Sequence, residues 1–299
     1  MSNLYADIAR RTGGDIYIGV VGPARTGKST FIKRFMELLV LPQMEEEHGK
    51  QRARDELPQS ASGRTVMTTE PKFVPNEAVS IKTEEGIELN VRLIDCVGYM
   101  VEGATGHMEG EEERLVKTPW FDYEIPFTKA AAIGTKKVIT EHSTIGVVVT
   151  CDGSFGEIAA KQYEPAEEET IKQLKALKKP FVVLLNTIHP YSESTKQLAA
   201  EKEEKYQTKV LPMNLEQMKK EDIYEIIKSV LMEFPISSIG FYVPRWTEML
   251  KKDHPLKMEL LQMARDVITE KTTMRDIYEE QEKEYEYITG QKLESVAMD

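Results

Sequence analysis

Short apolar runs alternate with amphipathic segments along much of this chain. Apolar runs with the length of buried strands lie at 16–21, 144–153, 180–186 and 209–215. The segments 31–41 and 164–179 have the spacing of amphipathic helices. Strands that alternate with helices of about 10 to 15 residues predict an α/β fold, in which a mostly parallel sheet is covered on both faces.

The segment 78–95 (AVSIKTEEGIELNVRLID) has a different pattern, because apolar and polar residues alternate on both sides of Glu84-Glu85-Gly86. Such alternation around a glycine-containing turn predicts a β-hairpin. The second strand of this hairpin ends at Asp95. We therefore expect one antiparallel pair within the otherwise parallel sheet.

Other segments lack a clear period. Residues 42–64 carry both charge signs together with Pro, Ser and Gly, and they predict an extended surface connection. Residues 98–136 predict a loop with an acidic part and an aromatic part. Residues 234–246 could add a strand, and helical, heavily charged sequence follows. The pattern predicts one domain at 1–235 and a mostly helical extension at 236–299.

Composition limits the class of protein. The 299 residues are 40% hydrophobic and 30% charged, as is typical of a globular chain. A formal net charge of -11 argues against nucleic acid as a partner, because the field of the molecule repels phosphate backbones. No run of about 18 apolar residues occurs, so we expect any membrane association to be peripheral or through a partner. The two cysteines lack metal-ligand spacing, which favours reduced thiols in a cytoplasmic protein.

The first predicted strand leads directly into a phosphate-binding motif. Residues 22–29 (GPARTGKS) satisfy G-x-x-x-x-G-K-S/T, with a strand before and a helix after, as this motif requires. The glycines would let successive backbone N–H groups face the phosphates, while Lys28 neutralises the β and γ oxygens and Ser29 ligates Mg²⁺. The predicted nucleotide-binding residues are Gly22, Pro23, Ala24, Arg25, Thr26, Gly27, Lys28, Ser29 and Thr30.

A second group of the Mg²⁺ site, an acidic side chain, is predicted at the end of the hairpin. Asp95 ends an apolar strand, at the edge of the sheet where ligands bind in open α/β folds. Gly98 completes Asp-x-x-Gly, and its N–H could contact the γ-phosphate. Placed downstream of Thr68 and Thr69, this tetrad resembles the switch layout of GTPase-type P-loop proteins. One of these threonines, with Thr69 as our choice, could complete the metal site; an ordinary turn before Pro71 is the alternative.

One departure from the GTPase pattern concerns the reaction. Tyr99 follows Gly98, where small GTPases usually carry a water-orienting Gln. Hydrolysis is therefore expected to be slow, or organised by another group. Arg25 and Arg64 are candidate sources of transition-state charge, and for each of them a solvated arginine is the alternative.

A second departure concerns the base. Where GTPases carry Asn-Lys-x-Asp, the sequence has Asn186-Thr187-Ile188-His189, of which we expect Asn186 to remain in the nucleotide site. The missing carboxylate would accept two hydrogen bonds from guanine, and a neutral imidazole has a single acceptor nitrogen. Loss of such a charged pair removes about 1.5 to 3 kcal/mol, enough to erase guanine selectivity. We infer ATP, or loose base selectivity, in a P-loop NTPase of GTPase-like (TRAFAC-type) topology.

Several longer segments resemble the amino-terminal part of the stage IV sporulation protein A family, the coat-morphogenesis ATPases of endospore-forming bacteria. The most particular blocks are DELPQSASG, TTEPKFVP and EHSTIGVV. The resemblance implies a P-loop ATPase with ATP and Mg²⁺ as cofactors. It implies Lys28 as the phosphate-loop lysine, Asp95 as the metal-directed acid, and Thr68 or Thr69 as the threonine needed for hydrolysis.

The resemblance also implies a biological role. In this family ATP hydrolysis drives self-assembly into a static layer around the forespore, in the mother-cell cytoplasm, and the layer recruits later coat proteins. A small amphipathic membrane protein recruits the layer to the outer forespore membrane. Family members are longer, so residues 236–299 are expected to begin a middle region. The alternatives are a regulatory GTPase-like switch that does not polymerise and a catalytically weak interaction module.

Overall fold

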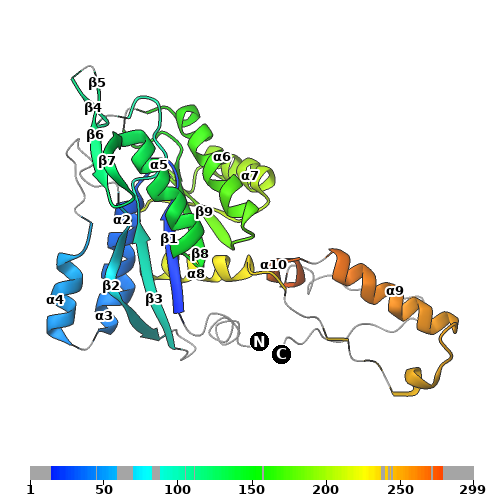
Figure 1. Ribbon diagram of the computed structural model, residues 1–299. Coiled ribbons are helices and arrows are strands. Elements are labelled where there is room, and N and C mark those ends of the chain that lie inside the picture. Colours follow the sequence, from blue (N-terminus) through cyan, green and yellow to red (C-terminus); the bar gives the residue numbers. More distant parts are fainter. Residues whose placement is uncertain are drawn as a thin grey trace. The chain divides into compact units, whose positions relative to one another are not determined.

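The computed structural model of the chain contains two compact units (Figure 1). The larger unit comprises Asn3–Val230, and the smaller comprises Leu231–Asp299 together with Met1–Ser2. The structure describes residues 15–44, 46–58, 70–82, 88–104, 106–110, 112–156, 158–236, 240–241, 243, 245–270 and 272–278.

A six-stranded sheet forms the centre of the larger unit. Its strands are β1 (Asp15–Val21), β2 (Lys72–Lys82), β3 (Glu88–Asp95), β8 (Ile145–Cys151), β9 (Phe181–Asn186) and β10 (Val210–Met213). The order is β10-β9-β8-β1-β3-β2, and β2 runs antiparallel to β3 while the other pairs are parallel. This arrangement confirms the predicted α/β fold with one antiparallel pair. The turn of the predicted hairpin, at 83–87, lies outside the described residues.

The strand order reverses at β1. This strand pairs with β3 on one side, where Ile18 is opposite Leu93, and with β8 on the other, where Val20 is opposite Val147. Because these strands are parallel, their carboxyl ends meet at one edge of the sheet. In open α/β sheets ligands bind at this edge, next to the point of reversal. The loops that follow β1, β3, β8 and β9 therefore surround one position.

Helices cover both faces of the sheet (Figure 1). They are α2 (Lys28–Phe35), which continues into η1 (Met36–Val40) and α3 (Leu41–Gln43), and α5 (Phe127–Lys137), η2 (Val138–His142), α6 (Ala160–Ala176), α7 (Glu193–Tyr206) and α8 (Lys220–Met232). On one face Leu174 of α6 and Tyr206 of α7 pack with Val148 of β8 in a buried core. On the other face α2 contacts β1 and β3, and its Phe31 and Phe35 are fully buried. These core contacts thus hold α2, and with it the turn that follows the end of β1, against the sheet.

Two segments of the larger unit differ from the prediction. Within the expected extended connection, residues 47–55 form the helix α4 (Glu47–Asp55). Ala53 is its buried residue, so α4 lacks the apolar stripe that a periodicity argument detects. Within the expected loop 98–136, the chain forms α5 and two small antiparallel pairs. The paired strands are β4 (Met108–Glu109) with β5 (Glu112–Glu113), and β6 (Leu115–Thr118) with β7 (Phe121–Pro126).

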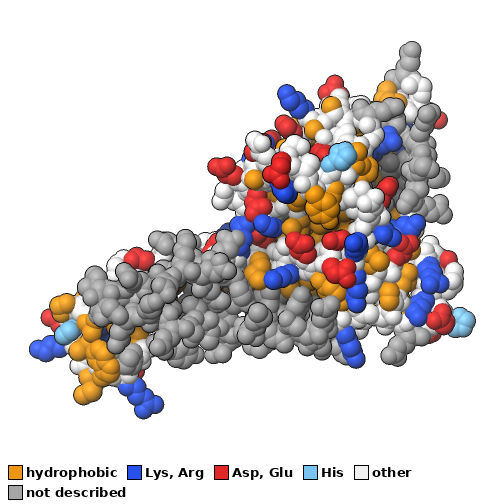
Figure 2. All heavy atoms as spheres, turned by 180° about the vertical axis from the view of Figure 1, so that it is seen from behind, with side chains coloured by type: hydrophobic (Ala, Val, Ile, Leu, Met, Phe, Trp, Pro, Cys, Tyr) orange, Lys and Arg blue, Asp and Glu red, His pale blue; other side chains and the backbone are white. Residues whose placement is uncertain are grey.

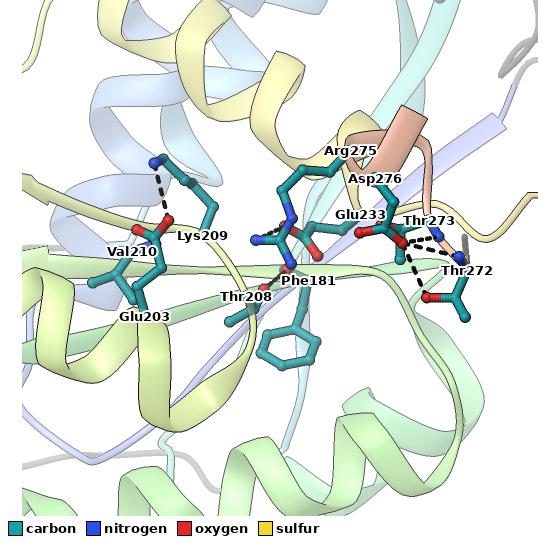
Figure 3. Close-up of polar contacts among 10 residues, drawn as sticks. All are labelled: Phe181, Glu203, Thr208, Lys209, Val210, Glu233, Thr272, Thr273, Arg275 and Asp276. Carbon is teal, nitrogen blue, oxygen red and sulfur yellow. Dashed lines mark hydrogen bonds and ion pairs between the residues drawn. The ribbon is translucent and has the colours of Figure 1, made fainter. Parts of the chain in front are cut away.

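The smaller unit contains η3 (Arg245–Met249), α9 (Pro255–Glu270) and α10 (Met274–Tyr278). The strand considered at 234–246 is reduced, in the described part of that segment, to one antiparallel bridge between Pro235 and Thr273. Arg275 forms an ion pair with the buried Glu233 at 3.2 Å, as Figure 3 shows. These contacts join the start of the unit to α10.

The exposed surface mixes both charge signs. On the face shown in Figure 2, acidic and basic side chains are interspersed around apolar ones. Among the described residues, each helix is too short or too polar to cross a bilayer.

Candidate active site

The glycine loop (residues 22–27) connects β1 to α2 and contains two glycines with positive φ, 124° at Gly22 and 102° at Gly27. A Cβ atom at Gly22 would lie 2.5 Å from the carbonyl oxygen of Val149 in β8, so this close approach requires glycine. The buried hydroxyl of Thr26 lies 2.7 Å from the same carbonyl oxygen. The loop is therefore held against β8 through its own backbone and one side chain.

The first turn of α2 offers backbone donors to an anion. The N–H of Phe31 donates to the carbonyl of Gly27 at 2.9 Å and begins the helical hydrogen bonding. The preceding N–H groups of Lys28, Ser29 and Thr30 have no acceptor within the helix, as at any helix N-terminus. Such donors, together with the helix dipole, bind phosphate groups. The motif residues therefore lie where a nucleotide phosphate would contact them.

Lys28 places a cation inside the glycine loop. Its side chain is buried, with 5% of the residue exposed, and Nζ donates a hydrogen bond to the carbonyl of Pro23. Burial lowers the pKa of Lys28, against the opposing influence of Cys96 and Asp95. A phosphate at this position would stabilise the charged ammonium, because an opposite charge nearby favours the ionised form.

The carboxylate of Asp95 meets the hydroxyl of Ser29 beside this lysine. Ser29 Oγ donates to Asp95 Oδ2 at 3.2 Å. Burial raises the pKa of Asp95 to about 6, while Lys28 and the hydrogen bond from Ser29 act in the opposite direction. The other oxygen, Oδ1, is buried and has no hydrogen-bond partner among the residues that the structure describes.

The hydroxyl oxygen of Ser29 and the carboxylate of Asp95 fit a magnesium ion. Hydroxyl and carboxylate oxygens are ligands that Mg²⁺ prefers, and a cation would satisfy the unpaired Oδ1 of Asp95. Within the described ranges, no group of three or more His, Cys, Asp or Glu could hold a metal. Among the described residues, Ser29 and Asp95 would thus hold the ion, and water and phosphate would add further ligands, as is usual for Mg²⁺.

Gly98 and Tyr99 lie directly against the glycine loop. The N–H of Tyr99 donates to the carbonyl of Gly22 at 3.2 Å, and the N–H of Ala24 donates to the carbonyl of Tyr99 at 2.8 Å. A Cβ atom at Gly98 would lie 2.2 Å from the Gly22 carbonyl oxygen and 2.6 Å from Nζ of Lys28. The structure therefore brings the Asp-x-x-Gly tetrad and the phosphate-binding motif together.

Asn186 supports the glycine loop from the end of β9. This buried amide donates from Nδ2 to the carbonyl of Thr26 at 3.0 Å, and its Oδ1 accepts from the N–H of Leu215 at 3.3 Å. A Cβ atom at Gly27 would lie 2.7 Å from the same Nδ2. His189, three residues further, is exposed. In this arrangement Asn186 contacts the loop, and the histidine is open to solvent.

The remaining predicted residues divide into two groups. Arg25 is an exposed residue of the glycine loop with a φ of 65°. Thr68, Thr69 and Arg64 lie outside the described residues. The sequence reasoning missed Gln173 in α6, whose Oε1 accepts a hydrogen bond from the Tyr99 hydroxyl at 2.8 Å. No sequence signal marks Gln173, because a polar residue on an amphipathic helix is ordinary.

Comparison with known proteins gives the family. Residues 1–235 match the model for Stage IV sporulation protein A, ATPase domain, and residues 236–299 match the model for Stage IV sporulation protein A, middle domain. The chain is 54% identical over 276 residues to Stage IV sporulation protein A of Clostridioides difficile (strain 630), which covers 92% of this chain and 56% of that protein. It is 46% identical over 298 residues to Stage IV sporulation protein A of Bacillus subtilis (strain 168), covering 99% of this chain and 61% of that protein.

A solved structure is more distantly similar: the crystal structure of an SsGBP mutation variant has a TM-score of 0.40 and 13% identity, covering 76% of this chain and 60% of that one. The assignment depends on the family models and on the close relatives. This chain spans 56% to 61% of the length of those two relatives. The two models together match residues 1–299, and the chain belongs to the stage IV sporulation protein A family.

Proposed function

We propose that this chain hydrolyses ATP to ADP and phosphate in the presence of Mg²⁺. The observation that carries the proposal is the meeting of Ser29 Oγ and Asp95 Oδ2 at 3.2 Å, beside the buried Lys28. The match of residues 1–235 to an ATPase domain model supports it independently.

The proposed roles follow from the contacts. Lys28 and the N–H groups at the start of α2 bind the phosphates, and the backbone of Gly98 faces the terminal one. Ser29 and Asp95 hold Mg²⁺, which when bound neutralises charge on the phosphate oxygens. Thr68 or Thr69 would complete this set from the segment between α4 and β2.

Slow turnover is part of the proposal. Tyr99 occupies the position after Gly98, and its hydroxyl donates to Gln173 in α6. This side chain is therefore engaged away from the glycine loop, and it cannot replace the water-orienting glutamine of small GTPases without breaking that hydrogen bond.

Phosphate release tests the enzyme. Lys28→Ala should abolish release above background, whereas Lys33→Ala, on the same helix but paired with Glu37 at the surface, should retain it. Equal rates for the parent and Lys28→Ala would mean that this chain is not an ATPase.

The choice of ATP rests on His189, which stands where GTPases carry the guanine-binding carboxylate and is exposed three residues after the end of β9. Binding of ATP and GTP should be measured under identical conditions. Binding of GTP tighter than ATP by about tenfold, or roughly 1.4 kcal/mol, would contradict this choice.

We also infer that hydrolysis drives self-assembly of the basement layer of the spore coat, at the forespore surface in the mother-cell cytoplasm. Membership of the stage IV sporulation protein A family supports this role, and partners would be other copies of the chain, coat proteins and a small amphipathic membrane protein. Light scattering with sedimentation tests assembly. A chain that hydrolyses ATP but stays small and soluble would instead be a nucleotide switch.

A further inference from the structure

The side chain of Tyr99 is hydrogen-bonded to the helix α6. Its hydroxyl donates to Oε1 of Gln173 at 2.8 Å, although 74 positions separate the two residues. The Tyr99 ring packs against an apolar cluster that includes Tyr163 and Ala166 of α6. Tyr99, in the loop after β3, is therefore hydrogen-bonded to the last turn of α6 and packs against a cluster to which α6 contributes.

The amide of Gln173 is oriented for this contact. Its Nε2 donates to Oε1 of Glu169, one turn earlier in α6, at 2.7 Å. An ionised carboxylate accepts hydrogen bonds and does not donate them, so the NH₂ group of the Gln173 amide must be the end that faces Glu169. Oε1 of Gln173 is then left to accept the Tyr99 hydroxyl.

The backbone of Tyr99 is hydrogen-bonded to the glycine loop. Its N–H donates to the Gly22 carbonyl, and its carbonyl accepts from the N–H of Ala24. Gly98 lies so close to the loop that a Cβ atom there would overlap the Gly22 carbonyl oxygen, at 2.2 Å. The Gly98–Tyr99 backbone is thus held between the glycine loop and α6.

We propose that Gln173 is a positioning residue for hydrolysis: by holding the Tyr99 hydroxyl, it fixes the backbone of Gly98 and Tyr99 beside Lys28. Tyr99 acts as an anchor at the position where small GTPases use a side chain to orient water. The proposal rests on the ATPase function proposed above, because its kinetic consequence concerns that reaction.

Steady-state kinetics with Gln173→Leu and Tyr99→Phe test the positioning role. Each variant should lower kcat by about three- to tenfold, the value of one neutral hydrogen bond, with KM for ATP changed less than about twofold. The double variant should be no slower than either single one, because both remove the same contact. Gln197→Leu is the matched control, since Gln197 in α7 makes the same kind of contact with Glu201, at 3.1 Å.

Additive losses in the double variant, or equal kcat values for Gln173→Leu and Gln197→Leu, would overturn the proposal. Hydrogen–deuterium exchange at the Tyr99 amide gives a readout that does not need turnover. Exchange should be at least about threefold faster in Gln173→Leu and Tyr99→Phe, and unchanged in Gln197→Leu. Unchanged exchange in all variants would contradict the anchor. An inactive parent with faster exchange in the two variants would reject the ATPase proposal and retain the anchor.

Discussion

The hydroxyl of Ser29 and the carboxylate of Asp95 are hydrogen-bonded at 3.2 Å, although 66 positions separate them in the sequence. Ser29 lies in the first turn of α2, and Asp95 ends β3. The contact exists because β1 and β3 are parallel neighbours, so the loop after β1 and the end of β3 meet at one edge. The two residues proposed to hold Mg²⁺ are thereby brought together from local motifs that are far apart in the chain.

Asp95→Asn should separate nucleotide binding from turnover. The substitution keeps the shape but removes the charge, while Lys28 and the N–H groups of α2 remain to bind phosphate. We expect a fall in kcat of at least about 100-fold, with an ATP dissociation constant within about fivefold of the parent. Binding of a fluorescent ATP analogue and phosphate release, each across a Mg²⁺ titration, measure the two effects.

Asp55→Asn in α4 is the control, because it removes a carboxylate that contacts Gln51 at the surface. It should match the parent in both assays. Equal losses of binding and turnover in Asp95→Asn would remove Asp95 from the metal site.

Gly98→Ala should disrupt the site through the backbone. The new Cβ would lie 2.2 Å from the Gly22 carbonyl oxygen and 2.6 Å from Nζ of Lys28, and the φ of 92° already disfavours alanine. The backbone must then move away from the glycine loop. A displacement of about 1 Å at a reacting centre can cost on the order of 100-fold in rate, and we expect a loss of at least this size in phosphate release.

Gly110→Ala is the control that separates steric overlap of the new Cβ from the backbone strain of a positive φ. Gly110 also has a positive φ, 69°, but a Cβ there would meet no atom within 4 Å among the neighbours that the structure describes. It should cost about 1 to 2 kcal/mol of local stability and leave turnover unchanged. Similar turnover in Gly98→Ala and Gly110→Ala would show that the close approach of Gly98 is not needed.

Some parts of this site are predictable from sequence and others are not. The strand, glycine loop and helix around residues 22–29 are encoded within a short segment, and the end of β3 at Asp95 follows from alternation in one hairpin. The contact between Tyr99 and Gln173 depends on how α6 packs against the sheet, and a polar helix residue has no local signature. The helix α4 was missed for a related reason, because its single buried residue leaves no apolar period to detect.

Asn186→Ala should weaken phosphate binding regardless of the base. The amide satisfies the buried carbonyl of Thr26 and the N–H of Leu215, and its loss leaves both without this partner. An unsatisfied buried group costs about 1 to 3 kcal/mol, and a distorted glycine loop that must recover this free energy on binding should lose affinity by at least about fivefold. If Asn186 acts by supporting the glycine loop, ATP and inorganic tripolyphosphate should lose affinity by the same factor, measured by calorimetry.

Asn90→Ala is the matched control, because Asn90 hydrogen-bonds Asp15 at the start of β1 and not at the ligand edge. It should leave both affinities unchanged. A loss confined to ATP in Asn186→Ala would instead show that the amide contacts the base or ribose.

The stability of the smaller unit should depend on pH through Asp276. Partial burial would raise the pKa of this carboxylate, but hydrogen bonds from Thr273 and Thr272 outweigh it, and the pKa is lowered (Figure 3). Because the folded pKa lies below the unfolded value of about 3.9, the stabilisation is present above that value and is lost as pH falls through the folded pKa. Asp276→Asn should therefore destabilise the unit at pH 7, by at most about 1 kcal/mol because solvent screens the carboxylate, and much less at about pH 3.

Urea unfolding followed by tryptophan fluorescence measures this pH dependence. The two tryptophans are Trp120 in the larger unit and Trp246 in the smaller, so unfolding in a Trp120→Phe background reports on the smaller unit through Trp246. Asp253→Asn, at an exposed position of the same unit, is the control, and a difference between Asp276→Asn and the parent that stays constant with pH would contradict the assignment.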